Sequence, residues 1–246
     1  MPIPTTTTPT EGVIASESFD DYELMLERWE ARGGAFYVAV VHMKLHFLFQ
    51  EGSAGQWHSP DRVRFVQEFE RLVRQYWGLH QIGRSAAGAR IALSPRFTSR
   101  IDGVWVTDHW EIVVLKSEDG YVGGEGVAGE THDGRRFALG PAHRRNRVYL
   151  SSAGNRRWRF VPSAVTIPSV HEYGHMLDPS LEDEYYYMRN GRSWDPERDR
   201  QAVLNYGTTV RARNVRRVLE WAQRKAAEHE HEREAAARRR SAATLR

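Results

Sequence analysis

The sequence predicts a single α+β domain, in which helices pack against a β-sheet. Residues 36–49 alternate apolar and mixed side chains along the whole run, which is typical of a half-buried strand. Residues 59–76 repeat apolar side chains every three or four positions, which is typical of an amphipathic helix. With 246 residues and 40% hydrophobic content, the chain can bury one sizeable core.

The N-terminal part is expected to contribute little to this core. Residues 1–18 are rich in Thr and Pro and lack the basic and apolar regions of a signal peptide, so we expect a disordered leader. Residues 19–32 are expected to form a short amphipathic helix, with Asp20 and Asp21 near its start and Gly33-Gly34 after its end.

The run at 36–49 is the clearest strand in the chain. One face carries the side chains expected in the core, namely Tyr37, Ala39, Val41, Met43, Leu45, Phe47 and Phe49. His42 and His46 share the other face, but four residues along a strand span about 13 Å, which is too far for one metal ion. We therefore interpret both histidines as ordinary strand residues.

The helix after this strand is expected to begin at Ser59-Pro60, with Ser59 as the N-cap, and to lie across the sheet. Further β-rich runs at 89–93 and 104–115 and a short run at 147–150 predict additional strands.

The glycines at 124, 126 and 129 formally match the pattern G-x-G-x-x-G. A nucleotide-binding loop requires a helix directly after this pattern, and the sequence that follows has no helical period. We therefore expect a flexible loop or a hairpin.

Residues 171–175 read His-Glu-Tyr-Gly-His, an H-E-x-x-H pattern. On a helix, His171 and His175 share one face and can direct two imidazoles at one point, while Glu172 projects from the flank. Two neutral imidazoles are typical Zn²⁺ ligands, and a neighbouring carboxylate can act as the base for a zinc-bound water. The pattern therefore predicts a catalytic zinc centre.

The surroundings of this motif support a buried helix. Pro168 and Ser169 mark its expected start, with Ser169 as a plausible N-cap, and Asp178-Pro179 marks its end. Three consecutive carboxylates, Glu182, Asp183 and Glu184, follow. Any of the three has the chemistry of a third zinc ligand.

From 166 to 221 the chain resembles the zincin clan of zinc metallopeptidases. It is most similar to metzincin-like bacterial members of the immunoglobulin A peptidase type, which read HEFGH, a short turn and DEY. The run Ala202-Val203-Leu204-Asn205-Tyr206 resembles the metzincin turn beneath the metal, with Leu204 in place of Met. The resemblance implies a zincin-like α+β fold, with a mixed twisted sheet, a packed helix, an active-site helix and a C-terminal helical subdomain.

The chain also departs from the long metzincin pattern HExxHxxGxxH. Asp178 occupies the Gly position and Leu181 the position of the last His. Alignment of the family's DEY with residues 183–185 makes Asp183 the preferred third ligand, Glu184 the second choice and Glu182 a distant third. The resemblance also implies that Tyr206 stabilises the oxyanion, although a packing tyrosine beside a turn fits the sequence nearly as well.

We expect residues 19–226 to form one metallopeptidase domain, with an upper part at 19–177 and a lower part at 178–226. From 208, Val210, Val215, Val218, Leu219 and Ala222 predict a last helix that packs back on the domain. Residues 227–246 are expected to be a basic flexible tail. Residues 211–246 carry 11 Lys and Arg against 5 Asp and Glu, so the net charge of +3 arises entirely there.

The expected function is hydrolysis of peptide bonds in protein or peptide substrates, with Zn²⁺ as cofactor and Glu172 as general base. Two alternatives remain open: a catalytically silent zincin-fold binding or structural module, and an injected effector or toxin peptidase. No apolar run is long enough to span a membrane, and only the basic tail suggests a nucleic-acid partner. With no Cys and no signal peptide, we expect synthesis in the cytoplasm, and any export would use another route.

Overall fold

The computed structural model describes residues 9–31, 34–78, 80–103, 108–117, 122–123, 128–131, 136–138, 146–161, 164–178, 201–204 and 207–244. The largest sheet comprises β1 (Pro9–Ser18), β2 (Glu23–Ala31), β3 (Gly34–Gln50), β4 (Gln81–Arg84), β5 (Arg90–Ile101), β6 (Trp110–Leu115) and β10 (Arg147–Ser151). Two small sheets comprise β7 (Val122–Gly123), β8 (Ala128–Thr131) and β9 (Arg136–Ala138), and β11 (Trp158–Val161) and β12 (Ala164–Thr166). The helices are α1 (Ser59–Trp77), α2 (Pro168–Leu177), the 3₁₀ helix η2 (Ala212–Val215) and α4 (Arg216–Thr244).

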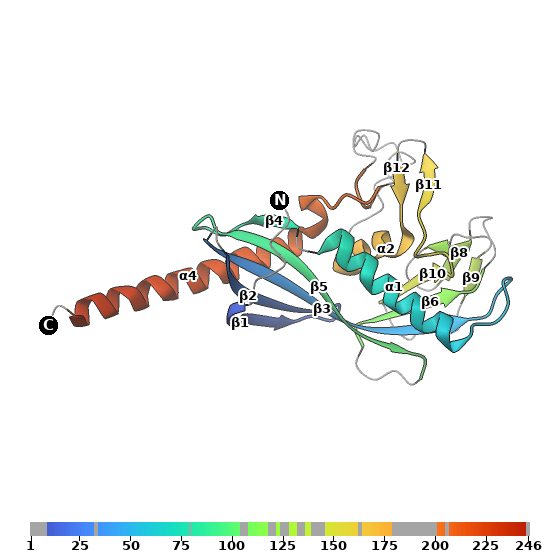
Figure 1. The fold of residues 1–246 in the computed structure, drawn as a ribbon, viewed down its shortest axis with the longest axis horizontal. Coiled ribbons are helices and arrows are strands. Elements are labelled where there is room, and N and C mark those ends of the chain that lie inside the picture. Colours follow the sequence, from blue (N-terminus) through green and yellow to red (C-terminus); the bar gives the residue numbers. More distant parts are fainter. Residues whose placement is uncertain are drawn as a thin grey trace.

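The long strand β3 is the centre of the main sheet (Figure 1). It pairs in parallel with β5 on one side, and on the other side with antiparallel β2 along its first half and parallel β6 along its second half. β1 pairs with β2, β4 with β5 and β10 with β6. The sheet is therefore mixed, and the α+β class predicted from the sequence is confirmed.

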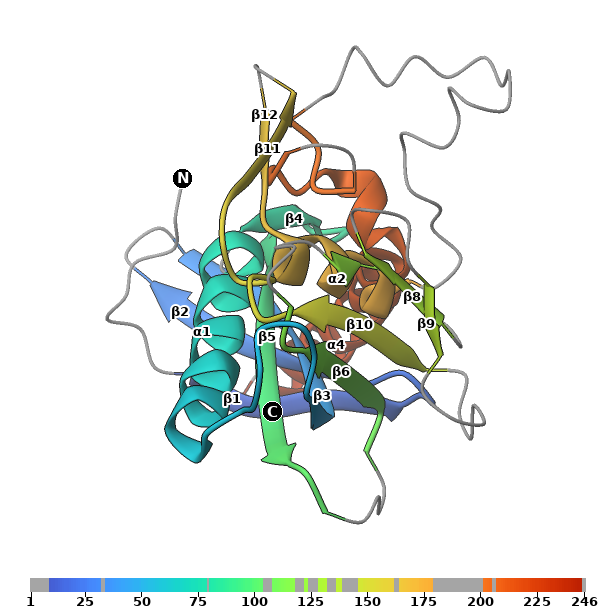
Figure 2. The same ribbon diagram turned by 90° about the vertical axis from the view of Figure 1, so that its right-hand side faces the viewer.

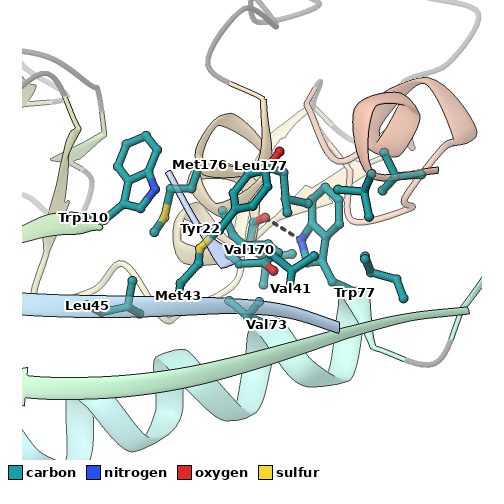
Figure 3. Packing of buried hydrophobic residues seen from close by; sticks show 14 of the residues in the cluster. Tyr22, Val41, Met43, Leu45, Val73, Trp77, Trp110, Val170, Met176 and Leu177 are labelled. Atoms are coloured by element: carbon teal, nitrogen blue, oxygen red, sulfur yellow. Dashed lines mark hydrogen bonds between the residues drawn. The ribbon is translucent and has the colours of Figure 1, made fainter. Parts of the chain in front are cut away.

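The core lies on the predicted face of β3. Tyr37, Ala39, Val41, Met43, Leu45 and Phe47 are all buried in one cluster that also contains side chains from α1, α2 and α4. Phe47 contacts Phe65 and Phe69 of α1. The site helix α2 therefore shares one continuous core with the sheet and α1 (Figure 3).

The prediction of a helix at 19–32 is wrong, because these residues contribute the strand β2. Leu24 and Leu26 are buried in the main core and alternate with partly exposed neighbours, which is the period of a strand. Ala31 pairs with Gly34, whose φ of 100° suits the end of a tight hairpin. Gly34, one of the two glycines that we interpreted as a helix stop, is thus the first residue of β3, and Gly33 lies outside the described residues.

The expected boundaries of the domain also need correction. Residues 9–18 of the expected leader form β1 and add a strand to the sheet, because they pair with β2 along its length. The expected flexible tail at 227–246 is helical as far as Thr244, because α4 continues well beyond the sheet (Figure 1). The predicted last helix is confirmed as α4, where the expected packing residues Val218 and Ala222 are buried. Val215, also expected to pack, is buried in η2.

The strands predicted at 89–93, 104–115 and 147–150 are confirmed as β5, β6 and β10, although 104–107 lie outside the described residues. α1 begins at Ser59 with Pro60 in its first turn, but His58 rather than Ser59 occupies the N-cap position. The glycine-rich stretch falls in the β7–β9 region, where Gly129 lies in a strand of a hairpin. Among the described residues, no helix has both the length and the apolar character needed to cross a bilayer.

Candidate metal centre

The helix α2 carries the histidine motif and is buried along its entire length. All ten of its residues, from Pro168 to Leu177, are buried. Pro168 lies in the first turn, where its missing N–H costs nothing, and the extended residue Ile167, not Ser169, is the N-cap. Asp178 is extended and ends the helix. The proline and the change of backbone conformation at Asp178 thus set the two ends of the ten-residue helix that contains the motif.

The two histidines of the motif converge. The Nε2 atoms of His171 and His175 are 3.4 Å apart, and the two residues are only 6% and 5% exposed. Two nitrogens that each bind at about 2.0–2.1 Å to one tetrahedral Zn²⁺ are about 3.3–3.4 Å apart. The pair therefore has the separation that a shared zinc ion requires.

The ring of His171 is oriented by a backbone carbonyl. Its Nδ1 lies 2.8 Å from the carbonyl oxygen of Val203. Since a carbonyl oxygen can only accept, Nδ1 carries the hydrogen, and the lone pair of the neutral tautomer is therefore at Nε2. This arrangement is typical of metal-binding histidines, in which the second ring nitrogen donates to a fixed acceptor.

The carbonyl of Val203 is itself held in a closed turn. Val203 N–H donates to the Thr209 carbonyl at 2.9 Å, Thr209 N–H donates to Gln201 at 2.7 Å, and Gly207 N–H donates to Ala202 at 3.0 Å. A Cβ at Gly207 would lie 2.0 Å from the Gln201 oxygen, so the turn requires glycine at this position. These bonds fix the acceptor that orients His171.

The same turn contacts the glycine of the motif. A Cβ at Gly174 would lie only 2.6 Å from Cδ2 of Leu204 and 3.2 Å from Cζ2 of Trp77. The absence of a side chain at Gly174 therefore allows the turn at 201–204 and the end of α1 to approach α2 closely. Leu204 is the residue that replaces Met in the sequence resemblance.

A tryptophan from α1 also anchors α2. The indole N–H of Trp77 donates to the carbonyl of Val170 at 2.9 Å, as the dashed line in Figure 3 shows. The rings of Trp77 and Tyr173 meet edge to face, with centroids 5.3 Å apart. Trp77 is fully buried, so this contact fixes α2 against α1.

Two tyrosines near the motif are buried: Tyr173 belongs to α2 itself, and Tyr22 directly precedes β2. Burial raises the pKa of Tyr22 to about 12, with a further rise from Asp21 and Asp178 that opposes the lowering by Arg217. Burial also raises the pKa of Tyr173 well above its usual value, with Tyr22 adding to the rise. Within the described residues neither hydroxyl has a hydrogen-bond partner. Both tyrosines are therefore neutral at physiological pH and contribute no charge near the histidines.

The structure places only part of the predicted site. Glu172 lies in α2 and is 3% exposed, beside the converging histidines. The candidates for the third ligand, Asp183, Glu184 and Glu182, and the candidate oxyanion donor Tyr206 lie outside the described residues. In the described part of the chain, no group of three or more His, Cys, Asp or Glu residues gathers as a metal site.

Two functional features escaped the sequence analysis. Trp77 follows the apolar stripe of α1 by one helical turn after Val73, so its burial was visible in the spacing although its bond to Val170 was not. The Val203 carbonyl is a backbone group, so no residue type in the sequence could have indicated it.

Comparisons with protein-family models, with curated proteins and with solved structures give no match to this chain.

Proposed function

We propose that this chain is a zinc-dependent metallopeptidase with a zincin-like fold. The observation that carries the proposal is the 3.4 Å separation of the His171 and His175 Nε2 atoms on a buried helix that also carries Glu172. The H-E-x-x-H pattern and its resemblance to zincins add support from the sequence.

The described residues fit a zinc ion chemically. Imidazole nitrogens are ordinary zinc ligands, and the donor bond from His171 Nδ1 to Val203 leaves Nε2 as the ligating atom. We propose Asp183 as the third ligand, with Glu184 as the alternative. When bound, the ion would supply Lewis acidity and a water of lowered pKa, about 7.

The chain's own groups carry the proton transfers. Glu172 accepts the proton of the water that attacks the scissile carbonyl and then passes it to the leaving amine. Tyr206 is proposed to donate a hydrogen bond to the oxyanion. The chain carries a glutamate at the base position of the motif, which an inactive module would not need, and this favours a catalytic site over a silent binding module.

Substitution of the base tests the proposed activity. We expect the parent chain to degrade unfolded casein and Glu172→Gln to lose at least about a hundredfold in rate while it keeps its metal, because a general base contributes about 10²–10⁴-fold. Full activity in Glu172→Gln would refute its role as base. Absence of activity from a zinc-loaded parent would favour the silent module.

A pair of alanine variants tests the ligand assignment. Asp183→Ala should lose zinc and Glu184→Ala should keep it, as elemental analysis of each purified variant can show. The reverse pattern would transfer the ligand role to Glu184, and retention of zinc by both would point to another residue.

A further inference from the structure

Three exposed arginines lie on the segment that leads into the site helix. Arg156 and Arg157 precede β11 and Arg159 lies within it, and all three are exposed. None of them forms an ion pair with a carboxylate of the described residues, whereas Arg71 and Arg74 of α1 each pair with a glutamate one turn away. We call Arg156, Arg157 and Arg159 the arginine hairpin.

The arginine hairpin is held firmly against the site. The N–H of Ser169, in the first turn of α2, donates to the Gly154 carbonyl at 3.0 Å. Asn155 donates from its side chain to the Phe65 carbonyl of α1 at 2.9 Å, and Arg157 donates to the Tyr76 hydroxyl at 3.2 Å. These bonds hold the chain before the arginines against α2 and α1, and they hold the Arg157 side chain against α1.

The location of the hairpin places this charge beside the proposed peptidase centre. Trp158 of β11 pairs with Thr166 of β12, and α2 begins directly after β12. Figures 1 and 2 both show the β11–β12 hairpin extending away from the main sheet at the end where α2 lies. The charge therefore lies on the segment that leads into the helix of the proposed centre.

The chemistry of the hairpin indicates its partner. Guanidinium groups bind carboxylates through paired hydrogen bonds, and three neighbouring cations create a local positive potential that attracts anions. Trp158, the aromatic residue among them, is only partly exposed and donates its indole N–H to the Ala153 carbonyl at 3.3 Å. The hairpin thus offers charge without the fully exposed stacking ring that single-stranded nucleic acids use.

We propose that the arginine hairpin binds an acidic stretch of the polypeptide substrate, rich in Asp and Glu, that flanks the bond to be cleaved. This inference rests on the proposed peptidase function. It assigns a substrate class: proteins with an acidic segment near an accessible peptide bond.

The test measures binding without turnover, in the Glu172→Gln background. The hairpin variant carries Arg156→Glu, Arg157→Glu and Arg159→Glu. The control carries Arg238→Glu, Arg239→Glu and Arg240→Glu, an equal charge change on the exposed end of α4. Fluorescence anisotropy gives the Kd of a fluorescein-labelled oligoglutamate peptide for each protein, and circular dichroism checks that each is folded.

We expect the hairpin variant to bind the peptide about tenfold more weakly than the parent, and at least about threefold, because it loses three exposed ion pairs that each contribute modestly. The control should stay within about twofold of the parent. Parent affinity should also fall as salt concentration rises. Equal binding by the parent and the hairpin variant, or equal losses in both triple variants, would overturn the proposal.

A second probe separates the two kinds of polyanion. If a labelled single-stranded oligonucleotide binds through the same arginines more tightly than oligoglutamate, the partner is a nucleic acid and the acidic-substrate proposal is wrong. Because these are binding measurements, they remain decisive for the hairpin even if the casein assay finds no peptidase activity. If the parent degrades casein but does not bind oligoglutamate, the acidic-substrate proposal is wrong and the peptidase proposal is unaffected.

Discussion

Gly174 is the residue whose environment most directly connects the motif to the fold. Its missing side chain leaves room for Leu204, whose backbone neighbour Val203 accepts the hydrogen bond from His171. The small residue between the two histidines is thus required by packing against the turn. The chemistry of the metal does not require it.

We predict that Gly174→Ala destabilises the parent by about 1 kcal/mol. Overpacking costs about 1–3 kcal/mol and outweighs the gain of about 1 kcal/mol in helix propensity. In a Leu204→Ala background, which makes room for the methyl group, the same substitution should become stabilising. Urea unfolding of the four proteins measures this double-mutant cycle. The same sign in both backgrounds would contradict the contact.

Among the elements, α1 holds α2 in place through Trp77. We predict that Trp77→Phe loses about 1–3 kcal/mol of stability, because the buried Val170 carbonyl loses its donor. We also predict weaker zinc binding, because α2 is no longer fixed. Trp57→Phe is a matched control. The indole N–H of Trp57 donates to the Gln50 carbonyl at 2.9 Å, and neither residue belongs to α2. Loss of zinc affinity in the control as well would argue against a local effect.

The free energy of unfolding is expected to depend on pH, because Glu23 of β2 forms hydrogen bonds with His42 and Lys44 of β3. Hydrogen bonds from Lys44 and His42 lower the pKa of Glu23 to about 2 from its usual 4.5. A lowered pKa contributes stability that is fully present above pH 4.5 and is lost as the pH falls from there toward 2. Glu23 is partly exposed, so solvent screening reduces this contribution to about 1 kcal/mol.

We therefore predict that Glu23→Gln is about 1 kcal/mol less stable than the parent near neutral pH and that the difference shrinks near about pH 3. Urea unfolding at both pH values measures it. Glu51→Gln, an exposed site after β3, is the control and should show a small difference that does not change with pH. A constant deficit for Glu23→Gln would show that the ionised carboxylate contributes no stability.

For the molecule as a whole, long and regular segments were predictable from the sequence. β3 and α1 were found because each keeps one period over more than ten residues. β2 was mistaken for a helix because ELMLERWE fits both periods, and the following glycines suit a helix end as well as a hairpin. Burial of Leu24 and Leu26 in the sheet core decides between them.

The candidate site was predictable only where local geometry determines it. The spacing of His171 and His175 on one helix is sufficient to bring them together. The contact that orients His171, from Val203, and the contact that holds α2, from Trp77, depend on long-range packing of residues 201–204 and of α1 against α2. No local pattern encodes such contacts, which explains why the sequence indicated the two histidines but not the residues that support them.

Elemental analysis of zinc in the purified chain tests the central claim most directly. We predict about one zinc ion per parent chain and none in His171→Ala or His175→Ala, because two imidazoles are required to hold the ion. His42→Ala should keep the zinc, since His42 bonds only to Glu23 and Thr98 among the described residues. A parent that binds no zinc, or a His175→Ala variant that keeps it, would contradict the account.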